Sequence, residues 1–313
     1  MSGGALAGRH LFVFGAGYTA SRAALRAHAA GARVSATTRD PLRAADLVAQ
    51  GVGVHLFDTS RPPSADRLRH WLDGVTDLLV SVPPDPTAPP EAACPVLAAL
   101  AGAGLDLGAP RWIGYLSSSA VYGDCGGAWI DETRPPAPIS ADARGRVGAE
   151  IGWRAVAVRQ GAALDILRIA GIYGPGPRNA LAQMRSGRAQ ALVKPGQVFN
   201  RIHAEDVAGA ILAAMTHPQG ERLTNLSDDL PAAPTEVLDH AAQLLGLPPP
   251  PRVAFDPAAL PPGVAAFWAE NRRLRNDRLR ALPGFALAFP TYREGLAAIL
   301  DAEKAATEMA DAL

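Results

Sequence analysis

The chain has 313 residues, which is enough for one large α/β domain and a smaller second one. Lysine and arginine together number 30, as do aspartate and glutamate, so no excess of charge points to nucleic acid or to an anionic membrane surface. The sequence has no apolar run of ~18 residues and no segment typical of a secretion signal, and its two cysteines, Cys94 and Cys125, are too few for a disulfide framework. We therefore expect a cytoplasmic protein that acts on a small molecule and has no metal site.

The first predicted elements are a strand, a glycine turn and a helix. The apolar residues Leu11–Phe14 predict a buried strand, and the helix that follows is predicted to end at Ala29. Between them, Gly15 permits a tight turn, and Gly17 lets the backbone approach a pyrophosphate that faces the N–H groups of the helix. This pattern favours a dinucleotide-binding loop over an ordinary strand–turn–helix. The candidate cofactor contacts in the loop are Gly15, Gly17, Tyr18 and Thr19.

The second strand, predicted over residues 33–38, ends where a nicotinamide enzyme of this type reads the ribose of its cofactor. An acidic residue there would accept hydrogen bonds from a ribose 2′-hydroxyl and would repel a 2′-phosphate. This chain has Thr38 and Arg39 instead, followed by the helix start Asp40–Pro41. We therefore expect NADP as the cofactor, with NAD as the alternative if Arg39 is only a solvated surface residue.

Strand and helix signals then alternate, which predicts βαβ units. The predicted helices cover residues 41–50, 65–73, 91–103 and 140–160, and the predicted strands cover 52–57, 77–81, 112–117 and 164–168. Asp58, Val82 and Pro83 follow two of these strands at the carboxyl edge of the sheet, where such folds bind ligands, so they are further cofactor candidates. The fold class expected is α/β, a Rossmann-type doubly wound parallel sheet.

Beyond residue 172 the periodicity weakens. Shorter elements are predicted over residues 179–186, 205–215, 222–226 and 234–245, and the final helix over 292–309. We expect a dinucleotide-binding domain over residues 1–174 and a smaller substrate-capping region over 175–313. Residues 203–228 are expected to contribute back to the Rossmann domain.

Motifs along nearly the whole chain carry a resemblance to a known family. These motifs are Gly15–Ala20, Ser117–Gly123, Arg168–Gly176 and Arg201–Val207. With them, the chain resembles an atypical extended short-chain dehydrogenase/reductase of the epimerase/dehydratase type. The resemblance implies an NAD(P)-dependent oxidoreductase or epimerase. It also implies a homodimer that pairs through the helices after the fourth and fifth strands.

The resemblance implies site residues but also reveals a departure from the family. Ser118 matches the serine that binds the reacting oxygen. The family's Tyr-x-x-x-Lys pair is absent, because no tyrosine of the chain has a lysine four residues later, and counting back from Glu150 places Asp142 and Arg146 at the two positions. Arg146 could bind the ribose but not relay a proton, and Asp142 could act as a base, or the two could form a surface helix pair. Tyr122 is the best substitute proton donor unless it is a packing residue.

Two classes of function therefore stay open. The first is an enzyme with an unidentified small polar substrate, whose reacting oxygen Ser118 polarises. The second is a non-catalytic NADP(H)-binding sensor or regulatory protein. A third possibility, an interaction module without a cofactor, would require that the glycine loop binds no dinucleotide. Nucleotide-sugar members often carry an arginine where this chain has Phe199, which disfavours such substrates, although Arg185, Arg188 and Arg201 could meet an anionic group.

Overall fold

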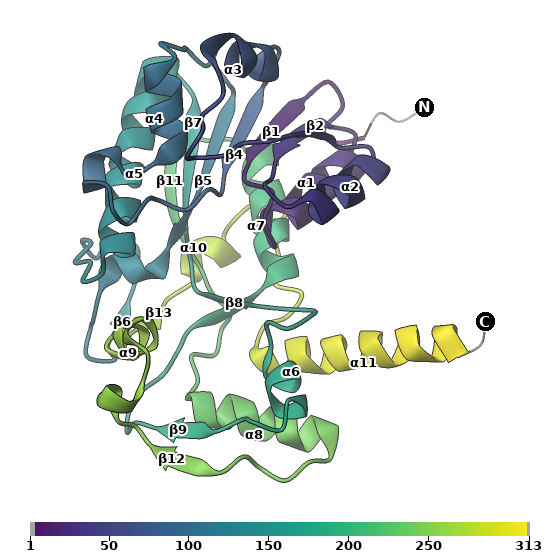
Figure 1. Cartoon of the computed structure of the whole chain (residues 1–313), viewed down its shortest axis with the longest axis vertical. Helices are drawn as coiled ribbons and strands as arrows, with labels where there is room; N and C mark the ends of the chain where they lie inside the picture. The colour runs from purple at the N-terminus through teal and green to yellow at the C-terminus, as the bar shows by residue number, and fades with distance from the viewer. Residues whose placement is uncertain (1–3, 312–313) are drawn as a thin grey trace.

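A computed structural model describes residues 4–311 and is organised around a parallel sheet of seven strands (Figure 1). The strand order is β11-β7-β5-β4-β1-β2-β3. The bounds are β1 His10–Phe14, β2 Arg33–Thr37, β3 Gly53–His55, β4 Asp77–Val80, β5 Trp112–Ser118, β7 Ala163–Ile169 and β11 Glu221–Leu226. The chain runs outward from β1 in both directions, which is a doubly wound order with its switch point between β1 and β4. The predicted Rossmann-type fold is confirmed.

Helices cover both faces of this sheet (Figure 1). One face carries α1 (Ala20–Ala29), α2 (Pro41–Ala49) and α7 (Ala204–Thr216), and the other carries α3 (Ala65–Leu72), α4 (Pro95–Gly102) and α5 (Ala141–Gln160). Successive side chains of a strand point to opposite faces. In β1, Leu11 and Val13 accordingly pack with the α1 side, whereas Phe12 and Phe14 pack with the α3 side.

The strand register aligns the carboxyl ends of the central strands. Val13 of β1 lies beside Ala36 of β2 and beside Leu79 of β4. The segments that follow these three strands therefore meet at one edge of the sheet, where a doubly wound fold binds its ligand.

The remaining elements lie mostly below the sheet in Figure 1 and have a hydrophobic cluster of their own. They include β8 Gly171–Tyr173, α6 Ala180–Arg185, β9 Ala191–Val193, β10 Arg201–His203, α8 Pro234–Leu245, β12 Arg252–Ala254, α9 Pro262–Trp268 and α11 Tyr292–Asp311. Strand β8 pairs with β10, and β9 pairs with β12. The first half of α11 packs on this cluster, and its second half projects away from it (Figure 1). None of the described helices has the length and apolarity needed to span a bilayer.

Two features differ from the expectations drawn from the sequence. The helix expected over residues 91–103 is divided into a 3₁₀ turn, η1 (Pro90–Ala92), and α4, which begins at Pro95 because proline fits the first helical position but not a helix interior. In addition, β13 (Arg273–Leu274) forms a separate two-stranded sheet with β6 (Trp129–Ile130), and β13 and α10 (Asp277–Arg280) pack against the core of the Rossmann sheet. Leu274 and Leu279 are buried in the same core as α1 and α7.

A glycine groove on α5 fixes the segment after β4. A Cβ on Gly148 would lie 1.9 Å from the carbonyl oxygen of Pro90, and one on Gly145 would lie 2.9 Å from Pro84. Because no side chain fits at these positions, the proline-rich segment that follows β4 lies directly against the α5 backbone.

Candidate cofactor and substrate sites

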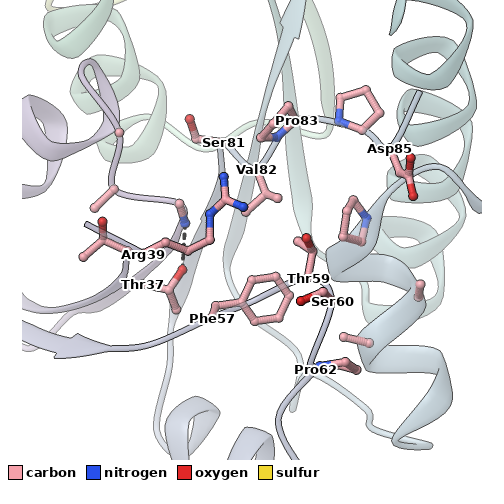
Figure 2. Close-up of a pocket in the computed structure, with 18 of the residues that line it drawn as sticks. Thr37, Arg39, Phe57, Thr59, Ser60, Pro62, Ser81, Val82, Pro83 and Asp85 are labelled. Atoms are coloured by element: carbon pink, nitrogen blue, oxygen red, sulfur yellow. Dashed lines mark hydrogen bonds between the residues drawn. The ribbon is translucent and has the colours of Figure 1, made fainter. Parts of the chain in front are cut away.

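An open cavity of about 1250 Å³ follows the carboxyl edge of β1, β2, β3 and β4 (Figure 2). We call it the edge cavity. Its lining includes the glycine turn after β1, the end of β2, and the segments after β3 and β4. Among the lining residues are Gly15–Tyr18, Thr37–Asp40, Arg43, Phe57, Thr59, Ser60 and Ser81–Pro86. This is the position where a doubly wound sheet binds a dinucleotide.

The glycine turn has the geometry that a bound pyrophosphate requires. Gly15 has φ +87°, and a Cβ there would lie 3.0 Å from both the backbone nitrogen and Cγ2 of Val82, so a side chain would be strained and crowded. Gly17 is open, because the nearest atom to a Cβ would be the Gly15 oxygen at 4.0 Å. Thr37 fixes the turn: its Oγ1 accepts from Gly15 N at 2.8 Å and its carbonyl oxygen accepts from Ala16 N at 2.7 Å (Figure 2). The turn therefore fits the phosphates of a dinucleotide.

Positive side chains line the cavity at the end of β2. Figure 2 shows the exposed Arg39 side chain pointing into the cavity, and Arg43 lines the same side. The one neighbouring carboxylate in the lining, that of Asp40, caps α2 by accepting from Leu42 N at 3.0 Å and from Arg43 N at 3.2 Å. The carboxylate of Asp40 is therefore engaged by the helix rather than offered to a ribose.

Most of the predicted cofactor contacts line the edge cavity. These are Gly15, Gly17, Tyr18, Thr38, Arg39, Val82 and Pro83. The lining does not include Thr19 or Asp58. Thr19 is buried as the residue before α1, and the Asp58 carboxylate accepts from Ser60 N at 2.9 Å and from Ser60 Oγ at 2.7 Å. These two bonds lower the pKa of Asp58 and form a local turn, which leaves the neighbouring Thr59 and Ser60 at the cavity.

Tyr18 connects the glycine turn to the segment after β8. Its hydroxyl donates to the carbonyl oxygen of Pro175 at 2.8 Å, and the Arg22 guanidinium lies 4.1 Å from its ring centroid. The Arg178 guanidinium lies 5.5 Å from the same centroid. Arg178 also lines the edge cavity, although it was not among the predicted cofactor contacts.

The predicted catalytic residues are distributed around the end of β5 and the first turns of α5. Ser118 ends β5, and its Oγ accepts from Ala120 N at 3.2 Å, so it caps the 3₁₀ turn η2 (Ser119–Tyr122). Arg146 of α5 donates from Nη1 to the carbonyl oxygen of Leu116 at 2.7 Å, which holds its guanidinium near the end of β5. Asp142 is exposed in the first turn of α5.

Tyr122 is a core residue. Its side chain is fully buried, its hydroxyl donates to Asn225 Oδ1 at 2.8 Å, and the Arg168 guanidinium lies 4.6 Å from its ring centroid. Burial raises the pKa of the phenol. Tyr122 therefore lies in the position of a packing residue, the alternative that the sequence left open, and its role as proton donor stays a prediction.

A buried ion pair lies beside these residues. Arg168 of β7 donates to Glu150 of α5 through Nε at 3.1 Å and through Nη2 at 2.7 Å. Ser117 Oγ donates to the same carboxylate at 2.7 Å. The Glu150 side chain thus connects α5 to β5 and β7 next to Ser118. No local sequence pattern predicts this network, because its members come from β5, α5 and β7.

A second cavity, of about 760 Å³, lies among α6, α8, α9 and α11. We call it the capping cavity. It shares Pro177 and Arg178 with the edge cavity and is also lined by Arg201. Neither cavity lining includes Ser118, Tyr122, Asp142 or Arg146.

The fold and the glycine turn define a Rossmann protein with a dinucleotide site. A family model described as the NAD dependent epimerase/dehydratase family matches residues 11–226, so the chain belongs to this family. The description of this family names NAD dependence and epimerase or dehydratase activity.

Three known proteins are similar to this chain. The structure of a conserved protein of unknown function from Silicibacter pomeroyi DSS is 43% identical, has a TM-score of 0.81, and matches over 94% of this chain and 99% of that one. Protein YeeZ of Escherichia coli (strain K12) is 35% identical over 142 residues, which are 45% of this chain and 48% of YeeZ. A 3-diazoavenalumate denitrifying reductase of a Streptomyces species is 31% identical over 145 residues, which are 42% of this chain and 45% of the reductase. The chain spans about half the length of the curated relatives it matches.

Proposed function

We propose that this protein is an NADP(H)-preferring oxidoreductase or epimerase that lacks the usual tyrosine–lysine pair and acts in the cytoplasm on a small polar substrate. The observation that carries the proposal is Arg39, which points into the edge cavity beside a glycine turn built for a pyrophosphate. The similarity to a reductase over part of the chain supports the oxidoreductase class.

Each part of the edge of the sheet has a distinct task in this proposal. The turn at Gly15 and Gly17 binds the pyrophosphate through backbone N–H groups, and Arg39 binds the 2′-phosphate of the adenosine ribose. The nicotinamide supplies hydride transfer when the cofactor is bound. Ser118 donates a hydrogen bond to the substrate oxygen. Arg146 holds the nicotinamide ribose and stays protonated, so it orients the cofactor without relaying a proton.

Cofactor titration tests the proposal. Wild-type protein should enhance NADPH fluorescence at lower concentrations than NADH fluorescence, and Arg39→Asp should reverse this preference by at least about tenfold, because it replaces a phosphate ligand with a repelling charge. Arg33→Asp is the matched control, since Arg33 is exposed at the opposite end of β2. Equal preference in wild type and Arg39→Asp would refute the NADP assignment, and binding of neither cofactor would refute the whole proposal.

A second candidate function, a non-catalytic NADP(H) sensor, is favoured by one observation. Neither cavity is lined by any of the four predicted catalytic residues, and the Tyr122 hydroxyl is engaged in the core. A sensor would bind the cofactor but would not oxidise NADPH with any carbonyl substrate. It would also bind a protein partner differently with NADP and NADPH. Turnover that is lost in Ser118→Ala would exclude the sensor and support the enzyme.

We further propose a homodimer that forms through α4 and α5. Two large apolar side chains of α5 are exposed in the single chain: Ile151 is 61% exposed and Val158 is 83% exposed. Sedimentation of the wild type should give twice the mass of the chain, and Val158→Glu should give a monomer. A monomeric wild type at micromolar concentration would contradict this assembly.

A further inference from the structure

The capping cavity has an unusual charge pattern for a site of its size. Its volume is in the range typical of small-molecule sites. The charged residues among the described residues that line it are Arg178 and Arg201, with no aspartate or glutamate. A cavity with this lining attracts an anion.

Arg201 is the deeper of the two arginines. Arg178 is exposed where the two cavities meet, whereas Arg201 is mostly buried. Arg201 Nη1 donates to the carbonyl oxygens of Phe199 at 3.0 Å and Ala232 at 3.1 Å, which positions the guanidinium. Its Nε and Nη2 groups have no such bond among the described contacts and are free to bind a ligand.

No carboxylate neutralises this guanidinium within the described part of the chain. None of the ion pairs formed by residues 4–311 includes Arg201. The nearby acidic groups are Asp228, which is buried, and Glu236, which is exposed on α8. Burial raises the pKa of Asp228 to about 8, so Asp228 is mostly uncharged at pH 7. A positive charge therefore faces the cavity without a counterion.

The rest of the cavity is apolar inside and polar at its mouth. Leu192, Leu238 and Leu296 line it together with the ring of Trp268. The polar residues Gln183, Ser186 and Gln190 are exposed and so belong to the mouth. Such a wall favours a flat or aliphatic apolar body over a sugar or a ribose, whose hydroxyls would lose their hydrogen bonds to water.

The aromatic wall extends to the residue that stands where nucleotide-sugar enzymes often have an arginine. Phe199 stacks on Phe267 with ring centroids 4.5 Å apart and meets Trp268 edge-on at 5.2 Å. The side chain at this position therefore packs in an aromatic cluster and offers no ligand for a diphosphate. The mostly buried guanidinium of Arg201, beside this apolar wall, matches one negative charge on an apolar molecule.

We propose that the capping cavity binds an organic acid, an apolar body that carries a single carboxylate, and that Arg201 binds this carboxylate. A guanidinium suits a carboxylate because two parallel N–H groups match its two oxygens. The inference rests on the proposed function in that the acid is the substrate of the proposed enzyme, bound in the capping cavity that adjoins the edge cavity at Pro177 and Arg178. It narrows the substrate class from a small polar molecule to an amphipathic monoanion.

Calorimetry with simple probes tests the inference on the full chain. The probes are 3-phenylpropanoate, its neutral amide and UDP. The acid should bind with a dissociation constant of about a millimolar, as expected for a ligand of this size, and the amide should bind at least about tenfold more weakly. Arg201→Met should bind the acid at least about tenfold more weakly than wild type does. Arg188 is exposed and lies outside the cavity lining, so Arg188→Met should bind the acid like wild type. Trp268 fluorescence should be quenched by the acid, and Trp268→Phe should remove that signal.

The outcomes separate the inference from the proposed function. If the amide binds as tightly as the acid, if UDP binds more tightly than the acid, or if the acid does not bind, the inference is overturned. The comparison of acid with amide on wild type needs no variant, so a misfolded Arg201→Met does not remove the test, and Arg201→Lys offers a second variant that keeps the charge. NADPH titration of the wild-type sample reports on the proposed function: wild-type protein that binds the acid but not NADPH refutes that function alone, and wild-type protein that binds NADPH but not the acid refutes the inference alone.

Discussion

Removing one partner of the buried Glu150–Arg168 pair should destabilise the protein strongly. The two side chains are 1% and 2% exposed, and two hydrogen bonds join them. In Arg168→Met, the Glu150 carboxylate stays buried and keeps only the Ser117 hydroxyl and the Arg154 guanidinium, 3.9 Å away. Breaking a buried ion pair in this way costs about 3–5 kcal/mol. For a chain of this size, that loss lowers the melting temperature by about 5–8 °C.

The assay is thermal unfolding at pH 7, with urea unfolding as a second measure of the free energy. The control is Arg69→Met, because the Arg69–Asp66 pair is 61% and 93% exposed and should contribute under about 0.5 kcal/mol. A double substitution, Glu150→Met with Arg168→Met, should recover part of the loss, since no charge is then left buried. A shift for Arg168→Met no larger than the control shift would refute the reasoning.

Three further predictions concern the glycine turn, the core tyrosine and a buried acid. Gly15→Ala should destabilise the fold by about 1–3 kcal/mol, because its φ is +87° and its Cβ would meet Val82 at 3.0 Å, as thermal unfolding will report. Tyr122→Phe should reduce stability by about 1–3 kcal/mol by leaving Asn225 without its donor, with NADPH binding and turnover unchanged. Asp228→Asn should melt at a higher temperature than wild type, by a margin that grows as pH rises from 3.8 to about 8 and then stays constant.

The sign of the last prediction follows from proton uptake. Because the pKa of Asp228 is raised in the folded state, the folded state binds more protons than the unfolded state between the two pKa values, and wild-type stability falls as pH rises. A margin that shrinks with rising pH would contradict the raised pKa.

For the glycine turn, Gly17→Ala is the control: it should melt like wild type, because a Cβ meets no atom within 3.9 Å, yet weaken NADPH binding. A large loss of turnover in Tyr122→Phe would restore Tyr122 as a proton donor.

The sheet and the cofactor edge were predictable because their signals are local. The strands β1, β4, β5 and β7 each contain a short apolar run, and the turn at Gly15 and Gly17 lies within one βα unit. The end of β2 was also readable, since Thr38 and Arg39 directly follow the strand. Local patterns could not place Asp58, because its direction depends on the turn that it forms with Ser60.

The sequence did not reveal features that depend on contacts between distant segments of the chain. The motif Ser117–Gly123 suggested a site tyrosine, but the direction of the Tyr122 hydroxyl depends on Asn225, which is 103 residues away. The packing of residues 273–280 against the core of the Rossmann sheet involves two-residue strand pairing that no periodicity reveals. The capping cavity is assembled from four helices of the second half of the chain, so its charge pattern around Arg201 becomes visible only after folding.

The glycine groove of α5 has a consequence for how ligands enter. The proline-rich segment after β4 forms one wall of the edge cavity and packs on α5, the helix that carries Arg146. The contact leaves no space for even a methyl group at Gly148. The proline-rich segment and α5 are therefore expected to move as one unit. A dinucleotide is therefore expected to enter from the opposite side of the edge cavity. The side chains of Arg39 and Arg178 are exposed there and can change conformation without disturbing the packed interior.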